Sequence, residues 1–273
     1  MRKFILFLLP LLVLWGCSKG GGKTDRYTIY DNVIDHSKTL AFGDDRDVYV
    51  FCDSIAWQGL QPFIGSAIEQ QINIVYPEKY FNLIMADSKE VQQLSKYKNL
   101  LFIGQLESDL PVSAYMKKVL SQDFIKRVKN TGGDLFSSEN LNCCDQIVLF
   151  LLGKDAKSLQ KIGALQAENI FSLLLKRFTN RQGYYAYQGK VIDPSFFDNY
   201  PFSLKIPDTF RLYSNDKVGR FLSFLYRARL ENKEIPDKYI SVYYEPMPEN
   251  NVDLNWLIAK RQEIGKKYFE GDE

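Results

Sequence analysis

Ile147-Val148-Leu149-Phe150-Leu151-Leu152 is the longest apolar run of the chain outside its first sixteen residues. An uninterrupted apolar run of strand length is typical of an interior strand that is buried on both faces of a sheet. Gly153-Lys154-Asp155 follows as a turn, and residues 156–178 then place apolar side chains at helical spacing. This strand–turn–helix unit predicts a sheet with helices packed against it.

Three shorter runs earlier in the chain have the same β-branched and aromatic character. They are Val48–Cys52, Leu83–Met85 and Leu100–Ile103. Apolar spacing predicts helices at residues 57–72 and 111–129, and a short helix that begins at Ser88. We expect four buried strands in one sheet, the fourth being Ile147–Leu151. The alternation of strands and helices predicts an α+β fold, a layered α/β-type domain with a mixed sheet.

The rest of the sequence continues this alternation, which indicates two similar strand–helix halves. Further strands are predicted at residues 184–187, 202–206, 210–213 and 239–244, and further helices at residues 218–230 and 254–268. We expect one mixed α/β domain over residues 25–273. Two stretches suit an internal boundary in it, residues 135–144 and residues 180–200.

The first sixteen residues have the order of a secretory signal. Arg2 and Lys3 provide the positive start, and residues 4–14 form an apolar segment of 11 residues. That length is well short of the about 20 residues that a spanning helix needs, so the segment is predicted to be a signal peptide. Its end, Leu14-Trp15-Gly16-Cys17, resembles the lipobox of bacterial lipoproteins.

The lipobox resemblance implies cleavage before Cys17 and a diacylglyceryl thioether on its sulfur. Residues 1–16 are then the signal peptide, and residues 17–24, which contain three consecutive glycines, form a lipidated flexible tether. The mature protein is expected in the bacterial cell envelope, anchored to a membrane through its lipid and facing the periplasm.

The charge balance of the predicted mature chain indicates no broad electrostatic partner. The 35 basic residues fall to 33 when Arg2 and Lys3 leave with the signal peptide, and this equals the 33 acidic residues. Nucleic acid is therefore excluded as a partner by charge as well as by compartment. The partners that remain are the membrane, reached through the lipid, and an unidentified envelope protein or glycan.

Few residues point to catalysis. The single histidine, His36, lies in a polar segment, and no phosphate-binding or nucleophile-elbow motif is present. Asp53, Asp87 and Asp155 each follow a predicted strand, where they could act on a cation or a sugar or could instead cap the next helix. We favour capping. No catalytic, cofactor-binding or metal-ligating residue is predicted.

Two other residue types leave alternatives open. Cys52, Cys143 and Cys144 could form one disulfide in an oxidising envelope, although buried free thiols are the favoured interpretation. They lack the paired spacing and histidines of a zinc site. Tyrosines at 184, 185, 187, 243 and 244 could stack on a glycan, but packing is the simpler explanation. If they lie in strands, adjacent tyrosines point to opposite faces.

The order of several segments resembles a family of uncharacterised bacterial envelope lipoproteins described as a domain of unknown function. Besides the leader that ends at Cys17, the matching segments are Asp53-Ser54-Ile55-Ala56-Trp57-Gln58-Gly59, Lys98-Asn99-Leu100-Leu101-Phe102-Ile103, Asp145-Gln146-Ile147-Val148, and Ile206-Pro207 followed by Phe210. The resemblance extends over most of the mature chain. It implies an envelope location and supplies no site residue beyond the lipid anchor.

Together these features predict a lipid-anchored envelope protein whose role is binding or assembly and not catalysis. The alternative is a carboxylate-dependent hydrolase or a glycan-binding protein that uses residues near Asp53 and Asp155.

The lipid anchor can be tested at its cysteine. Cys17→Ala removes the sulfur that accepts the lipid, so an uncleaved precursor is expected to accumulate. Mass spectrometry of the membrane-extracted wild-type protein should find an acylated Cys17 at the new N-terminus. An N-terminus without acyl mass would contradict the prediction.

Overall fold

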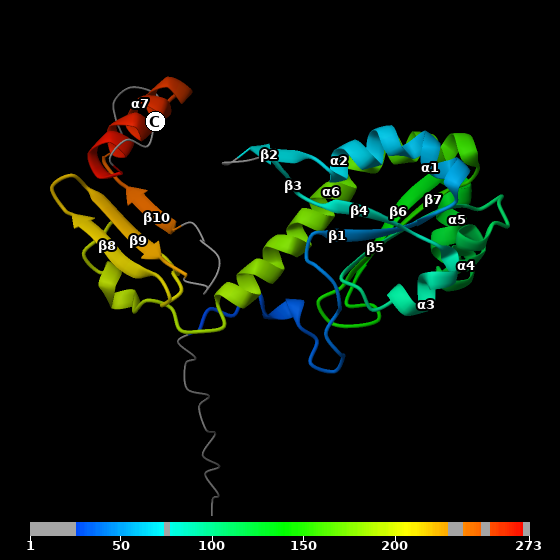
Figure 1. Ribbon diagram of the computed structural model, residues 1–273, viewed down its shortest axis with the longest axis horizontal. Coiled ribbons are helices and arrows are strands. Elements are labelled where there is room, and N and C mark those ends of the chain that lie inside the picture. The colour runs from blue at the N-terminus through cyan, green and yellow to red at the C-terminus, as the bar shows by residue number, and fades with distance from the viewer. Residues whose placement is uncertain (1–25, 74–76, 229–236, 247–251, 270–273) are drawn as a thin grey trace, which may run out of the picture. The chain divides into compact units, whose positions relative to one another are not determined.

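A computed structural model describes residues 26–73, 77–228, 237–246 and 252–269 (Figure 1). The predicted signal peptide, the tether and Cys17 lie outside these described residues. The chain divides into two compact units, Met1–Lys190 and Val191–Glu273. Each unit is described by itself below.

The first unit contains a five-stranded mixed sheet in the order β4-β1-β5-β7-β6. The strands are β1 (Asp47–Cys52), β4 (Asn82–Ala86), β5 (Asn99–Gln105), β6 (Gly133–Glu139) and β7 (Ile147–Gly153). Only β6 is antiparallel to its neighbour, β7. All four predicted strands lie in this sheet, and the mixed α+β fold is confirmed.

One part of the strand prediction is wrong. Leu83–Met85 is not buried, because β4 is an edge strand with a neighbour on one side only. The Met85 side chain is 46% exposed. In contrast β7 is buried along its whole length between β5 and β6, as its uninterrupted apolar sequence predicted.

Helices cover both faces of the sheet, which explains why its interior strands are apolar at successive positions along most of their length. One face packs against α1 (Ser54–Leu60), the π-turn η2 (Gln61–Gly65), α2 (Ser66–Ile68) and α6 (Ala156–Ala186). The opposite face packs against α3 (Val91–Leu94), α4 (Pro111–Val119) and α5 (Gln122–Thr131). Figure 1 shows these three layers.

Several smaller elements connect the layers. They are the 3-10 turns η1 (Asp31–Val33) and η3 (Ser88–Glu90), and a separate two-stranded ribbon of β2 (Gln71–Asn73) and β3 (Pro77–Lys79). The single helix predicted at residues 111–129 is two helices. Ser121 accepts a hydrogen bond from the Phe124 N–H at 3.2 Å and so caps a new helix, α5. Residues 135–144 lie in β6 and the turn that joins it to β7.

Helix α6 contributes two arginines to the interior. Arg181 is fully buried, and its Nε donates to Asp145 Oδ1 at 2.5 Å. Its Nη2 donates to Asn99 Oδ1 at 2.9 Å. The Arg177 guanidinium, one helical turn earlier, donates to Glu139 Oε2 at 2.8 Å. These bonds join α6 to the amino-terminal ends of β5 and β7 and to the end of β6.

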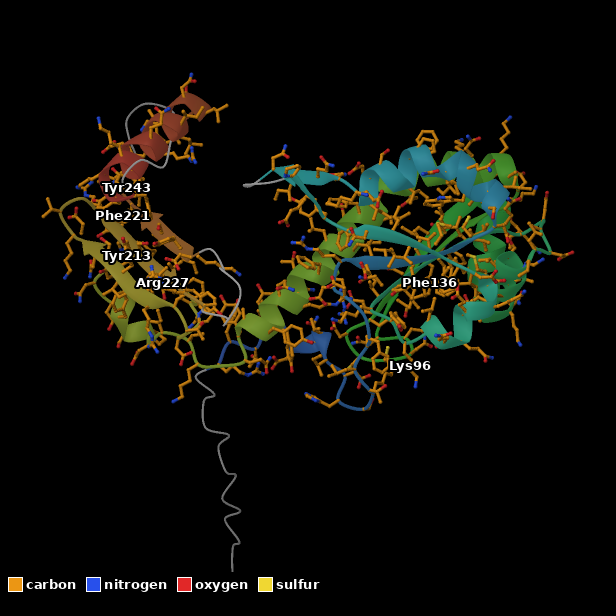
Figure 2. The ribbon with its side chains drawn as sticks, in the orientation of Figure 1. Lys96, Phe136, Tyr213, Phe221, Arg227 and Tyr243 are labelled. Carbon is orange, nitrogen blue, oxygen red and sulfur yellow. The ribbon has the colours of Figure 1, made fainter. Side chains whose placement is uncertain are left out.

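The second unit is built on a three-stranded antiparallel sheet in the order β10-β9-β8. It comprises η4 (Pro194–Phe197), β8 (Arg211–Asp216), β9 (Phe221–Tyr226), β10 (Lys238–Tyr243) and α7 (Leu254–Tyr268). A mainly aromatic cluster that contains Phe197 and Phe224 packs on one face. On the other face Phe221 stacks on Tyr268 of α7, with ring centroids 3.8 Å apart. Phe221, Tyr213 and Tyr243 are labelled along this sheet in Figure 2.

Three predictions for the second half of the chain are wrong. Residues 221–226 of the predicted helix 218–230 form β9, residues 184–186 belong to the end of α6, and 202–206 is not a strand. β9 is covered on both faces, so its apolar residues fit helical and extended spacing equally well. The two units also differ in topology, since the first sheet is mainly parallel and the second is antiparallel. The predicted halves, which divide near residues 135–144, do not coincide with these units, because β7 and α6 of the later half belong to the first unit.

The buried arginine can be tested by unfolding. Arg181→Ala leaves the Asp145 carboxylate buried without its cation, and we expect the free energy of unfolding to fall by about 3–5 kcal/mol. Urea denaturation of the leaderless protein measures this change, and Lys161→Ala, an exposed lysine on the same helix, is the control. The control should change stability by no more than about 0.5 kcal/mol.

A double variant makes the test specific to the ion pair. Asp145→Asn combined with Arg181→Met removes both charges. The stability that this double variant loses should be smaller than the sum of the losses measured for Asp145→Asn and Arg181→Met singly. Simple addition of the two losses would show that the residues do not act as a pair.

Candidate functional site

Two of the three carboxylates singled out in the sequence are helix caps. Asp87 forms a capping box with Glu90 at the start of η3. Asp155 accepts a hydrogen bond from the Ser158 N–H at 2.8 Å and caps α6. Both carboxyl pKa values are lowered, chiefly by these backbone hydrogen bonds. The capping interpretation therefore holds at both positions.

Asp53 differs, because its side chain makes no capping bond although it precedes α1. The Ser113 side chain on α4 interacts with this carboxyl group, and the Ser113 Oγ accepts a hydrogen bond from the Gln105 N–H at 3.0 Å. Burial raises the pKa of the Asp53 carboxyl, and the nearby Ser113 hydroxyl opposes the rise. Asp53 follows β1, and Gln105 ends the adjacent β5. The connections from these two strands leave in opposite directions, a position where open α/β sheets bind ligands.

Asp53 and Ser113 together are one carboxylate and one hydroxyl, whereas acid–base hydrolysis of a glycoside uses two carboxylates. Asp87 and Asp155 are engaged in helix caps, so neither is free to act as a second acid beside Asp53. Within the described ranges, no three histidine, cysteine, aspartate or glutamate side chains gather so that they could hold a metal ion.

His36 is exposed and lines a pocket of about 360 Å³ in the first unit. The other lining residues are Ile34, Lys38, Leu40, Cys144, Tyr184, Tyr185 and Gln188. Tyr184 and Tyr185 both reach this pocket because they lie on a helix and not on a strand, and their rings meet edge to face with centroids 5.4 Å apart. The separation of adjacent tyrosines to opposite faces was expected only in a strand, so it does not apply to this pair.

The other tyrosines pack against protein. Tyr187 contacts Tyr27 and Tyr30. Tyr243, the last residue of β10, lies under the Lys260 ammonium group. Tyr244, the next residue, contacts Phe202. This adjacent pair does separate to opposite faces, as extended backbone requires.

The three described cysteines are buried free thiols. Cys52 ends β1, and Cys143 and Cys144 precede β7. Because these strands are parallel and β5 lies between them, the thiols are at opposite ends of the sheet. Burial raises the pKa of Cys52 to about 12 and that of Cys143 to about 11.

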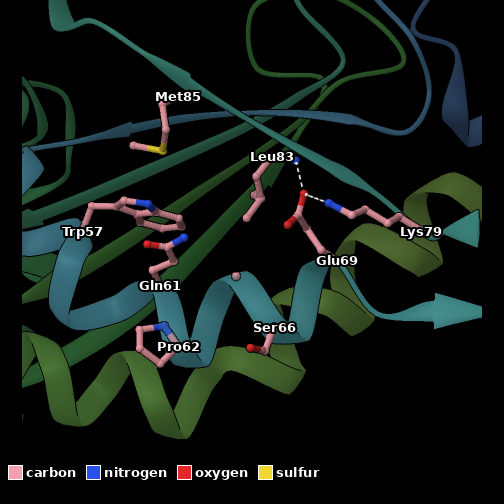
Figure 3. A pocket seen from close by; sticks show the side chains of 9 residues that line it. Trp57, Gln61, Pro62, Ser66, Glu69, Lys79, Leu83 and Met85 are labelled. Atoms are coloured by element: carbon pink, nitrogen blue, oxygen red, sulfur yellow. Dashed lines mark hydrogen bonds and ion pairs between the residues drawn. The ribbon is translucent and has the colours of Figure 1, made fainter.

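A groove of about 570 Å³ lies between the first helices and edge strand β4 (Figure 3). Its apolar surface comes from Trp57, Pro62, Leu83 and Met85. Gln61, Gly65, Ser66, Glu69 and Lys79 complete the lining. A volume of this size is in the range of ligand-binding sites, which is about 300–1,000 Å³.

The backbone of β4 is open along this groove. The Asn82 N–H donates to Arg46 O at 2.9 Å, so it faces β1. The polar groups of Leu83 and Met85 face away from β1, because the hydrogen-bonding direction alternates along a strand. The Leu83 N–H donates to Glu69 Oε1 at 3.3 Å, and Lys79 Nζ donates to the same oxygen at 2.9 Å. Figure 3 shows Glu69 between these two donors.

Glu69 therefore blocks one backbone donor of the edge, whereas the edge near Met85 stays accessible. A row of outward N–H and C=O groups is a template for pairing with another strand. The sequence indicated neither the edge position nor the groove, because Asn82–Ala86 resembles an interior strand in composition. Trp57 is partly buried and lines the groove.

Comparisons with protein-family models, curated proteins and solved structures found no match to this chain. The resemblance to envelope lipoproteins therefore stays a prediction from the sequence. Among the described helices, none is both long and apolar enough to cross a membrane.

The thiols can be tested by alkylation. At pH 8 a thiol of pKa about 12 is ionised to a fraction of about 10⁻⁴, so native Cys52 should resist iodoacetamide. In urea all three thiols should react fully, and mass spectrometry would count the alkyl groups added to the chain. Above about pH 9 the unfolded thiols ionise while the folded ones stay protonated, so stability should fall as pH rises. Rapid modification of native Cys52 would contradict its burial.

Proposed function

We propose that this chain is a lipid-anchored protein of the bacterial cell envelope that binds an extended segment of a partner protein in the groove beside β4. It does not catalyse a reaction on that partner. The observation that supports the proposal is the open backbone edge of β4 next to apolar side chains. The predicted lipid on Cys17 would hold the groove at the membrane surface through the tether of residues 17–24.

An extended peptide suits both the backbone edge of β4 and the apolar side chains of the groove. Its main chain can pair with the outward groups of Met85, and its alternate side chains can contact Trp57 and Leu83. Main-chain pairing provides affinity, and the side-chain contacts provide selectivity. A compact ligand such as a nucleotide would leave the strand edge unpaired.

The groove also contains a feature that would set the register of the peptide. Glu69 already accepts the Leu83 N–H and pairs with Lys79, so the peptide has to pair beyond this point. The first free donor of the edge is then the Met85 N–H. Met85 is the position at which the proposal is most directly tested.

A second candidate is glycan binding at the pocket that contains Tyr184 and Tyr185. The observation in its favour is that both rings reach one pocket together with the polar side chains of His36, Lys38 and Gln188. Aromatic faces and hydrogen-bonding side chains are groups that contact sugars. Oligosaccharide binding there would change tyrosine fluorescence and leave hydrogen exchange of β4 unaltered, which separates the two candidates.

The peptide proposal can be tested with Met85→Pro. Proline removes the outward N–H, and an edge strand tolerates it when that N–H faces away from the sheet. Peptides are selected from a displayed random library against the leaderless wild-type protein, and their affinity is measured by calorimetry. We expect Met85→Pro to bind at least about tenfold more weakly, because one backbone hydrogen bond is lost.

Met85→Leu keeps the N–H and a side chain of similar size, so it is the matched control and should bind as wild type. Hydrogen exchange at Met85 should slow when the peptide binds. The proposal fails if no peptide is selected, if Met85→Pro binds normally while folded, or if exchange at β4 does not change.

A further inference from the structure

Helix α7 packs on the sheet of the second unit through its middle and its carboxyl half. Asp253 caps it by accepting a hydrogen bond from the Trp256 N–H at 2.8 Å. Toward its carboxyl end Gly265 is buried and Tyr268 stacks on Phe221. These contacts fix the second half of the helix against the sheet. The first half has to be explained separately.

The first turns of α7 expose large apolar side chains. Leu254 is 70% exposed, Leu257 is 52% exposed and Ile258 is 46% exposed. Their spacing of three and four residues places them on one side of the helix. Val252, just before the helix, is also exposed. Such a group of exposed apolar side chains marks an interaction surface.

Cationic side chains follow this apolar group along the helix. Of the four cations of α7, Lys260 pairs with Glu263 and Lys267 pairs with Asp216. The other two, Arg261 and Lys266, are exposed. The Lys260 ammonium lies 5.9 Å from the Trp256 ring centroid. Trp256 itself is partly buried. Exposed apolar side chains beside exposed lysine and arginine are typical of helices that bind at a membrane interface.

The size of the apolar group argues against a protein partner as its main occupant. Four side chains can bury on the order of a few hundred Å². A specific protein interface needs about 800 Å² from each partner. A bilayer needs no matching surface, because the side chains enter the acyl region while the cations contact anionic headgroups.

We propose that the first turns of α7 insert into the surface of a bilayer that contains anionic phospholipid. Leu254, Leu257 and Ile258 provide the apolar contact, and Arg261 and Lys266 provide the charge. This contact does not depend on the lipid predicted on Cys17 or on the groove beside β4. It would add a second attachment, one that orients the second unit on the membrane.

The test uses the chain without its leader and Cys17, so that no lipid contributes. Its two tryptophans are Trp57 and Trp256, and Trp57→Phe makes Trp256 the only reporter. Vesicles of phosphatidylcholine with an equal part of phosphatidylglycerol should shift its emission to shorter wavelength, and brominated lipid should quench it. Vesicles of phosphatidylcholine alone should bind at least about tenfold more weakly, and added salt should weaken binding to the anionic vesicles.

Leu257→Asp places a charge in the apolar group and should reduce binding to the anionic vesicles at least about tenfold. The matched control is Val218→Asp, which changes a 97% exposed apolar residue of the same unit outside α7. The control should bind as the parent protein. The proposal is overturned if the anionic vesicles do not bind, if Leu257→Asp binds normally, or if Leu257→Asp abolishes a dimer seen by sedimentation and the parent protein ignores vesicles.

Discussion

The buried ion pair between Arg181 and Asp145 is the constraint on which the first unit depends. Both side chains are almost inaccessible to solvent, so neither charge can be satisfied by bulk water. Asp145 adopts a positive φ of 64°, which few residues other than glycine tolerate. The pair therefore requires one path for the turn before β7 and one position for the carboxyl half of α6.

A buried pair of this kind adds little net stability, because desolvation offsets most of the attraction between the charges. The effect of the pair is to select one alignment of the strands with α6. Asn99 extends the same network, since its Nδ2 donates to the carbonyl oxygens of Asp45 and Asp47 at 3.0 and 2.8 Å. The starts of β1, β5 and β7 are thereby aligned with one helix. A shift of any strand by one residue would leave a buried charge or amide unpaired.

Because helices cover both sheet faces, the backbone of the two edge strands is the part of the sheet that is open to pairing with another strand. At one edge β6 is a polar strand, and Phe136 on it contacts Phe124 of α5. At the other edge β4 faces the groove, and only one of its outward donors is blocked, by Glu69. This difference between the edges is the reason that we place partner binding at β4.

The sequence by itself determined the elements whose signal is local. Continuous apolar runs identified β1, β5 and β7, because a strand covered on both faces needs apolar residues at successive positions. Only the tertiary structure decided which strand is an edge, that residues 221–226 form a strand, and that Tyr184 and Tyr185 share a pocket. Strand order and the partner of Arg181 depend on contacts between residues far apart in the chain, 36 positions in the case of Asp145. Local periodicity contains no information about such contacts, so the groove beside β4 and the exposed turns of α7 became visible only in the folded protein.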